Sequence, residues 1–153
     1  MWQLIAQLLA YPPVARWLYR RAQRTPYRHL GGYMRRWWLF NGYDRPGHIS
    51  WLPSIRMHHI EREDVGRHLH DHPWNARTFV IAGGYLERRV NGALSTRLCG
   101  DTATLKYGEY HSIDRVMPGG AWTIFVTGRK RGTWGFLVDG QKIPHHVYLA
   151  ERE

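Results

Sequence analysis

The chain has little cysteine and no long hydrophobic run, and these two shortages exclude several classes of protein. Cys99 is the single cysteine among 153 residues, which excludes a disulfide framework and any zinc site built from cysteines. The uncharged stretch 1–15 is too short to cross a bilayer as a helix and is interrupted by Gln3 and Gln7. Since 43% of the residues are hydrophobic and 14% are aromatic, the chain has enough apolar material for one core.

Acidic residues are also scarce, and none precedes Asp44. The chain has 12 aspartates and glutamates against 22 lysines and arginines, for a formal net charge of +10. Seven arginines stand before Asp44: Arg16, Arg20, Arg21, Arg24, Arg28, Arg35 and Arg36. The apolar spacing from Trp2 to Leu9 fits one face of a short helix, and Pro13 suits the first turn of a second helix. We therefore predict a basic, helical N-terminal extension over residues 1–43 and one domain over residues 44–153.

The sequence does not decide which surface the N-terminal extension packs against or binds. We expect it to pack on the domain or on a second subunit of a homodimer. The alternative is a basic amphipathic helix that binds an anionic membrane surface or nucleic acid, although no nucleic-acid motif accompanies it. A secretory signal carries its positive charges before the apolar stretch, whereas here the arginines follow it, so we expect a cytoplasmic protein.

The remainder of the chain has the pattern of a β protein. Short β-branched and apolar runs alternate with Gly, Pro and Asn, and Asn91-Gly92 is a strong hairpin signal. The runs predict strands at 54–60, 78–82, 85–90, 94–99, 102–105, 110–116, 121–126 and 133–138. Strands this short and this regularly spaced are typical of a sandwich or barrel.

Histidines stand out among the polar residues. The chain has ten, and five of them lie between residues 58 and 72. In an extended chain, residues two apart point to the same face, so His70 and His72 can offer two imidazoles to one metal ion. The pair His68 and His70 is the competing choice. A third ligand must come from elsewhere in the fold, and His111 begins a later predicted strand.

The residues that follow the histidine pair have a recognisable spacing. Four residues separate His72 from Arg77, and six more separate Arg77 from Gly84. This spacing resembles the first motif of the cupin family, in which His-x-His is followed by Glu and then by Gly. The His-Asp-His-Pro-Trp stretch and the Gly-Gly-Tyr-x-Glu run are similar to a group of uncharacterised bacterial and phage cupins.

The second motif of that family has a counterpart as well. Gly100 is followed by five residues, then by Lys106-Tyr107-Gly108, two residues and His111. Fifteen residues separate Gly84 from Gly100, which is the short separation of small single-domain cupins. The resemblance covers roughly residues 54–138 and implies an all-β fold, a cupin-type jelly-roll β-barrel that the helical extension precedes.

The departures from the family pattern concern the metal. Arg77 stands where the family often has an acidic ligand, and Glu87, the nearest later carboxylate, is the alternative acidic ligand. The resemblance therefore implies a three-histidine site, as in thiol dioxygenase cupins, that holds one divalent transition metal at His70, His72 and His111. Iron is our first assignment, but zinc, nickel, manganese and copper also suit imidazole ligands, so the spacing does not decide between them.

From this resemblance we expect a metal-dependent enzyme, an oxygenase as the first choice, that acts on a small polar and anionic molecule. Arg77 would face the cavity and bind a carboxylate or phosphate, unless Glu87 pairs with it. Tyr85 would contact the substrate, and His68 and Tyr110 are the catalytic candidates. The alternatives are a metal-dependent isomerase or epimerase and a non-catalytic ligand-binding module.

Overall fold

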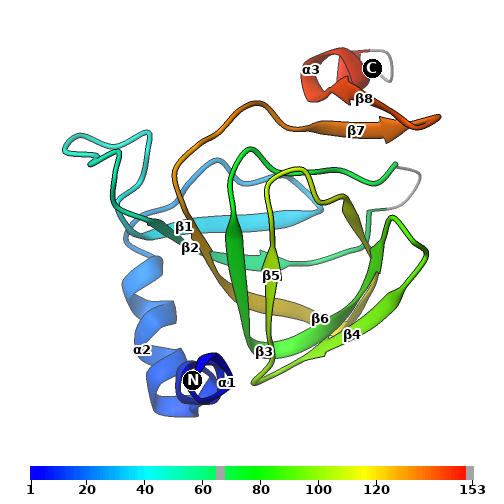
Figure 1. Cartoon of the computed structure of the whole chain (residues 1–153). Coiled ribbons are helices and arrows are strands. Elements are labelled where there is room, and N and C mark those ends of the chain that lie inside the picture. Colours follow the sequence, from blue (N-terminus) through cyan, green and yellow to red (C-terminus); the bar gives the residue numbers. More distant parts are fainter. Residues whose placement is uncertain (65–67, 151–153) are drawn as a thin grey trace.

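Two helices lead into an antiparallel sheet that curves around a cavity (Figure 1). The computed structural model describes residues 1–64 and 68–150. The elements are α1 (Trp2–Ala10), α2 (Pro12–Ala22), β1 (Met34–Phe40), β2 (Ser54–Ile60), β3 (Ala76–Arg89), β4 (Leu94–Leu98), β5 (Thr102–Leu105), β6 (His111–Thr127), β7 (Gly135–Val138), β8 (Gln141–Pro144) and α3 (His145–Ala150). The predicted all-β domain with helices before it is confirmed.

The long strands β3 and β6 form the centre of the sheet. The strand order is β1-β2-β6-β3-β4, every pairing is antiparallel, and β5 pairs with the first part of β3. The hairpin of β7 and β8 is joined to the histidine segment through a bridge between His70 and Phe136. Figure 1 shows this hairpin and α3 at the end of the barrel opposite α1.

Glycine pairs bend the two long strands where the sequence predicted breaks. The predicted strands 78–82 and 85–90 are one strand, β3, and the predicted strands 110–116 and 121–126 are one strand, β6. Gly83 has φ +66°, and the register shifts on both sides of it. A Cβ at Gly83 would lie 2.0 Å from the carbonyl oxygen of Gly120, and a Cβ at Gly120 would lie 2.7 Å from the carbonyl oxygen of Ile60 on β2, so both positions require glycine.

The predicted N-terminal extension is helical only as far as Ala22. Residues 34–40 form β1, which pairs with β2, so the predicted boundary at residue 43 is wrong. Trp37 and Trp38 are both buried, and alternation along a strand sends them to opposite faces of the sheet. Trp37 packs in the core below the helices, whereas Trp38 contacts Arg56 on the cavity side.

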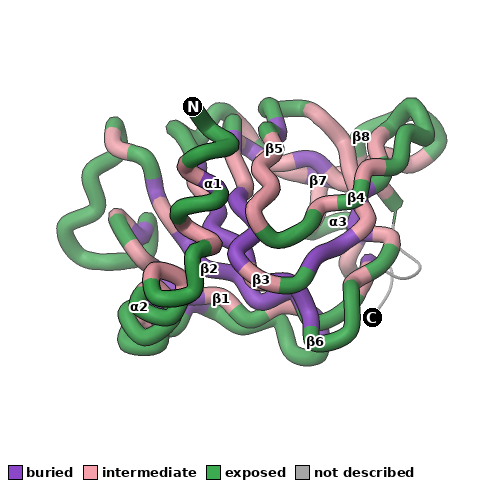
Figure 2. The backbone as a smooth tube through the Cα atoms, turned by 90° about the horizontal axis from the view of Figure 1, so that it is seen from below, coloured by how far each residue is buried: buried purple, intermediate pink, exposed green. Residues whose placement is uncertain are grey.

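The sheet has one face against the helices and one face toward the cavity. On β2, Met57 belongs to the core below α1 and α2, whereas Arg56 and His58 line the cavity. This core contains Ala6, Ala22, Trp37, Met57, Phe79, Ile81 and Ile124. Figure 2 shows the buried backbone along β2, β3 and β6. The helices therefore pack on the domain, which was the first of the two predicted arrangements.

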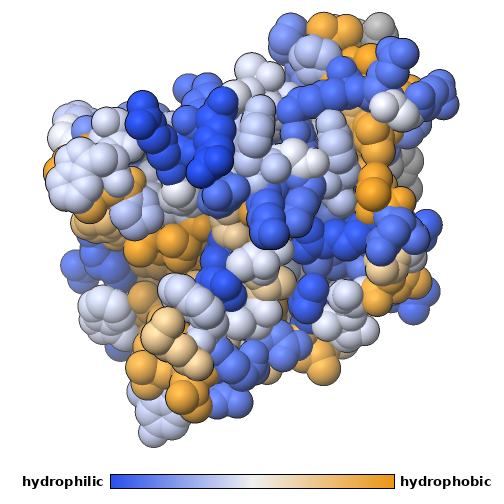
Figure 3. Space-filling view, viewed as in Figure 1, coloured by the Kyte–Doolittle hydropathy of each residue, from blue (hydrophilic) through white to orange (hydrophobic). Residues whose placement is uncertain are grey.

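Exposed apolar side chains gather over α1 and α2 (Figure 3). Leu4 is 70% exposed, and Leu8 and Trp17 are also exposed on these helices. In the described part of the chain, every helix is too short or too polar to pass through a membrane. Formation of a homodimer and binding to a membrane surface or to nucleic acid stay predictions.

Candidate metal centre

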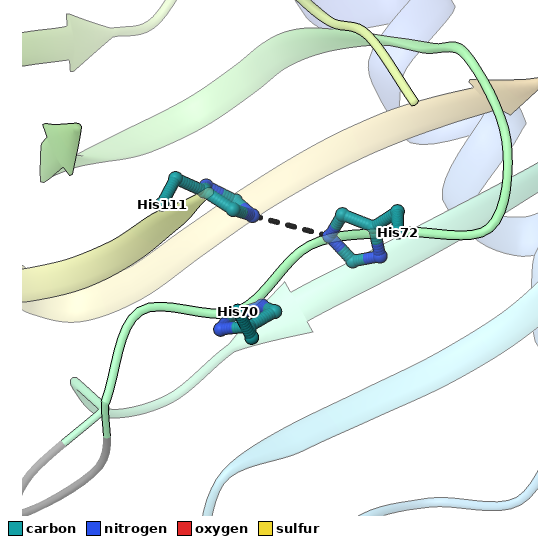
Figure 4. A group of neighbouring side chains, drawn as sticks. All are labelled: His70, His72 and His111. Carbon is teal, nitrogen blue, oxygen red and sulfur yellow. Dashed lines mark hydrogen bonds between the residues drawn. The ribbon is translucent and has the colours of Figure 1, made fainter. Parts of the chain in front are cut away.

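Three histidines from two separate segments meet at the wall of the cavity (Figure 4). His70 and His72 come from the segment before β3, and His111 is the first residue of β6. The backbones of His70 and His111 exchange two N–H···O hydrogen bonds of 2.9 Å, which fixes the register of the two segments. One nitrogen atom of each ring lies within 4.8 Å of the corresponding atoms of the other two.

The spacing of the ring nitrogens suits one metal ion. The Nε2 atoms of His72 and His111 are 3.1 Å apart. Two nitrogens bound to one ion at about 2.0–2.1 Å, with the angles of a tetrahedral or octahedral site, lie about 2.9–3.4 Å apart. Burial, followed by the charges of His111 and His70, holds the pKa of His72 well below its ordinary value, so its ring is neutral at neutral pH. The three residues therefore fit a divalent transition metal.

Glu87 on β3 lies behind His111 and outside the cluster. Its Oε1 accepts a 2.9 Å hydrogen bond from Nδ1 of His111, which leaves Nε2 of that ring for the cavity. Arg89 and Arg97 lie 3.1 and 3.3 Å from the same carboxylate. Burial alone would raise the pKa of Glu87, but the hydrogen bond and charge of His111 and the two arginines hold it below its ordinary value. Glu87 orients a histidine of the cluster, and the idea that it replaces the missing carboxylate ligand is wrong.

Asp71 points away from the histidine cluster, as alternation predicts. Its carboxylate accepts a hydrogen bond of 2.8 Å from the backbone N–H of Gly135 and a second one from Lys142. His70 forms isolated β-bridges to His111 and Phe136, and the segment around it is not a regular strand. Asp71 instead holds the histidine segment against the β7–β8 hairpin.

The two predicted catalytic residues lie elsewhere. Nδ1 of His68 is 2.8 Å from the hydroxyl of Tyr148, and His68 belongs neither to the histidine cluster nor to the cavity wall. The alternative ligand pair of His68 and His70 is therefore not the one that the fold assembles. Tyr110 faces the hollow on the outer side of the barrel. The structure brings neither residue to the site where we expected it.

Arg77 is also on the outside, and the prediction that it faces the cavity is wrong. Its guanidinium lies 4.5 Å from the ring centre of Trp2 in α1, and its Nη1 is 3.3 Å from the hydroxyl of Thr102. The next residue, Thr78, lines the cavity, so alternation turns Arg77 to the opposite face. The alternative, an Arg77–Glu87 pair, is absent among the described contacts as well, since Glu87 binds His111, Arg89 and Arg97.

The cavity itself has a volume of about 690 Å³. Besides the histidine cluster, its wall includes Tyr27, Tyr43, Trp74, Tyr85, Phe125 and Trp134. Tyr85 is where we expected it, although its contact with a substrate stays a prediction. Burial and then the charge of Glu87 raise the pKa of Tyr85 to about 12, so its hydroxyl is neutral and can donate a hydrogen bond.

Sequence reasoning missed a second group of polar residues in this cavity. Arg56 and His58 both lie on β2 and are buried. The sequence pattern could have indicated them, because Arg56 and His58 alternate with Ile55 and Met57 along one strand. Residues that alternate in this way lie on opposite faces of a sheet. Alternation turns one of the neighbours His58 and His59 toward the cavity, and this is His58, whereas the ring of His59 stacks on Trp122.

The buried ring of His58 predicts a loss of stability in mild acid. Burial, followed by the charge of Arg56, holds its pKa well below 6.5, so the unfolded chain takes up a proton near pH 6.5 that the folded chain does not. We expect this residue to lower the free energy of unfolding of the metal-free protein by about 1 kcal/mol between about pH 7 and pH 5.5. Urea unfolding of the unmodified protein and of His58→Gln at several pH values measures this effect. The same pH dependence of the free energy of unfolding in both proteins would contradict it.

Comparison with known proteins supports the fold and no more specific relationship. No family model matches the sequence, and no curated protein matches it. Among solved structures, an RmlC-like cupin from Shewanella frigidimarina has a TM-score of 0.52 and 18% identity over 71% of this chain and 87% of its own. A KdgF protein from a Halomonas species has a TM-score of 0.53 and 14% identity over 71% and 92%.

Two further structural neighbours are longer enzymes. A single-site variant of oxalate decarboxylase from Bacillus subtilis has a TM-score of 0.59 and 16% identity over 84% of this chain. A DMSP lyase has a TM-score of 0.53 and 13% identity over 67% of this chain. The chain spans about a third of the decarboxylase and about half of the lyase. Identities this low show a shared fold and leave activity open.

Proposed function

We propose that this chain, which has the fold of the cupin superfamily, is a metal-dependent enzyme that acts on a small polar molecule inside its barrel. One observation carries the proposal. The ring nitrogens of His70, His72 and His111 converge at the wall of a cavity of about 690 Å³, with no carboxylate in the cluster among the described residues. A site that binds a metal through three neutral imidazoles, next to a space for a ligand, is typical of a catalytic centre.

The residues of the chain divide the work as follows. The three histidines would hold the ion, and Glu87 keeps the proton of His111 on Nδ1 so that Nε2 stays a lone-pair donor. Tyr85 offers a neutral hydroxyl that can orient a substrate oxygen. The aromatic rings of the wall would displace water from a bound substrate, which would strengthen its polar contacts. The bound ion would supply Lewis-acid activation of a substrate oxygen or a binding position for O₂.

We propose iron as the ion and O₂-dependent oxidation as the reaction. Three neutral ligands leave coordination positions for both a substrate and O₂, which supports an oxygenase. The oxalate decarboxylase of Bacillus subtilis contains Mn(II) centres, so manganese is the second ion to test.

A second reaction class, metal-dependent isomerisation or elimination, has one observation in its favour. His58 is a buried neutral imidazole whose Nε2 has no hydrogen-bond partner among the described residues, and it lines the same cavity. Such a group can accept a proton from a substrate whose carbonyl the metal polarises. O₂ is not required for this chemistry.

The test separates these reactions without a known substrate. Protein loaded with Fe²⁺ or with Zn²⁺ is incubated with a small-molecule cell extract, with ¹⁸O₂ or without oxygen, and compounds that change are followed by mass spectrometry. We expect ¹⁸O incorporation with the iron protein only, and its loss in His111→Ala. Conversion that proceeds equally with zinc and without O₂ would support the isomerase, and no metal-dependent change would support a binding module.

A further inference from the structure

Arg56 is a buried cation for which the described part of the chain supplies no paired anion. It lies on β2, is 4% exposed and lines the cavity. Its Nε is buried and has no hydrogen-bond partner, and no residue in the described ranges 1–64 and 68–150 forms an ion pair or hydrogen bond with its guanidinium. Instead, the guanidinium carbon lies 5.0–5.8 Å from the ring centres of Trp38, Tyr43, Trp74 and Phe125. Aromatic faces attract a cation, but less strongly than a carboxylate does in a dry site.

The carboxylates nearby are already engaged. Among the residues that the structure describes, two carboxylates line the cavity, against five arginines. Asp64 accepts a 2.9 Å hydrogen bond from the backbone N–H of Ile113, and Glu87 is held by His111 and two arginines. Asp44, which adds a favourable charge, accepts a 2.7 Å hydrogen bond from the Trp38 indole. The cavity therefore has an excess of positive charge, and a bound metal ion would add to it.

Two more polar atoms near Arg56 lack partners. Among the described residues, the buried side-chain nitrogens without a hydrogen bond are Nε of Arg56, Nε2 of His58 and Nε1 of Trp74, and all three residues line this cavity. Buried polar atoms are seldom left unpaired in folded proteins. Their gathering in one space indicates a polar group of a ligand.

This group of residues adjoins the histidine cluster. The rings of Trp74 and Phe125 lie next to the guanidinium of Arg56, and the same rings lie 6.2 and 5.8 Å from the ring of His72. A molecule of modest size can therefore contact Arg56 at one end and the histidine cluster at the other. Its body would lie along aromatic rings, which suits a planar or apolar skeleton.

We propose that Arg56 binds a carboxylate of the substrate, with the indole N–H of Trp74 as a second donor. The guanidinium edge is a planar fork that matches the two oxygens of a carboxylate. The role as a substrate anchor rests on the proposed metal-dependent function, but the binding of carboxylates by Arg56 does not require the metal. An anionic substrate, first expected because of Arg77, thus has a different basis in the folded protein.

The test is calorimetric titration of the full-length, metal-free protein with benzoate, with its uncharged analogue benzamide and with inorganic phosphate. We expect benzoate to bind at least about tenfold more tightly than benzamide. Arg56→Gln should weaken benzoate binding by about tenfold or more and leave benzamide unchanged. Arg77→Gln, the same substitution outside the cavity, should bind benzoate as the unmodified protein does. If Arg56→Gln does not fold, Arg56→Lys is measured instead. Lysine keeps the positive charge but lacks the planar guanidinium, so benzoate binding should weaken by less than the loss of about tenfold expected for Arg56→Gln.

Several results would overturn the proposal. They are no benzoate binding by the unmodified protein, equal binding in the Arg56 variants, or tighter binding of phosphate than of benzoate. The metal content of each protein as purified, and its uptake of added Fe²⁺ or Zn²⁺, are measured separately and distinguish the two proposals. If the protein neither contains nor takes up metal but binds benzoate through Arg56, the proposed enzyme is refuted and the anion site is kept. If it holds stoichiometric metal but its benzoate binding does not depend on Arg56, the anion site is refuted and the proposed enzyme is kept.

Discussion

Replacing His111 with alanine is expected to abolish stoichiometric metal binding. The His111 ring supplies one of three nitrogens that lie within 4.8 Å of one another, and two imidazoles bind a divalent ion far more weakly than three. Since loss of a residue that merely supports a ligand costs about 10–100-fold in metal affinity, loss of the ligand itself should cost more than about 100-fold. Elemental analysis of each purified variant, together with circular dichroism to confirm the fold, measures the effect. His70→Ala and His72→Ala should behave in the same way.

His68→Ala is the matched control, because His68 belongs to the same segment and contacts Tyr148 rather than the cluster. It should retain the metal. Full occupancy in His111→Ala, or equal losses in His68→Ala and His72→Ala, would contradict the ligand assignment.

Glu87→Gln is expected to lower the affinity for metal by about 10–100-fold without removing a ligand. The carboxylate of Glu87, which is 3% exposed, accepts the hydrogen bond from Nδ1 of His111. An amide of the same shape has no negative charge and can turn its NH₂ group toward His111, so the ring loses its fixed orientation and becomes a weaker donor. Competition with a chelator of known affinity, at constant pH, gives the metal dissociation constant.

Glu109→Gln separates this effect from a general loss of charge. Glu109 also pairs with Arg89, at 3.3 Å, but it contacts no histidine of the cluster. Its substitution should leave the affinity for metal within about twofold. A similar loss in both variants would mean that the arginine network, and not the contact with His111, controls the site.

The histidine cluster could be predicted from the sequence because its geometry depends on local rules. Alternation places His70 and His72 on one side and Asp71 on the other, and a single backbone bridge between His70 and His111 brings the third ring to them. The fold class followed from strand-length runs and from the spacing of two motifs. The predicted positions of the three histidines hold although the backbone around residue 70 is irregular, because they require only an extended segment next to one strand.

The second part of the cavity could not be predicted, because it depends on contacts between distant segments. Arg77 was assigned to the cavity by its position in a motif, and the pleat of β3 turns it outward onto Trp2 of α1. The guanidinium of Arg56 lies among four aromatic rings that come from β1, β6 and two connecting segments. No local sequence pattern indicates that those rings converge. The glycines that bend β3 and β6 look like chain breaks in the sequence, because the close contacts of Gly83 with Gly120 and of Gly120 with Ile60 form only in the folded sheet.

The most direct test of the central claim is the metal content of the untagged protein, measured by inductively coupled plasma mass spectrometry after anaerobic purification and dialysis against metal-free buffer. Three imidazoles converging in the barrel predict about one transition-metal ion per chain, and close to none in a variant that lacks His70, His72 and His111. Less than about a tenth of an ion per chain in a folded, unmodified protein that also fails to take up added Fe²⁺, Mn²⁺ or Zn²⁺ would contradict the claim.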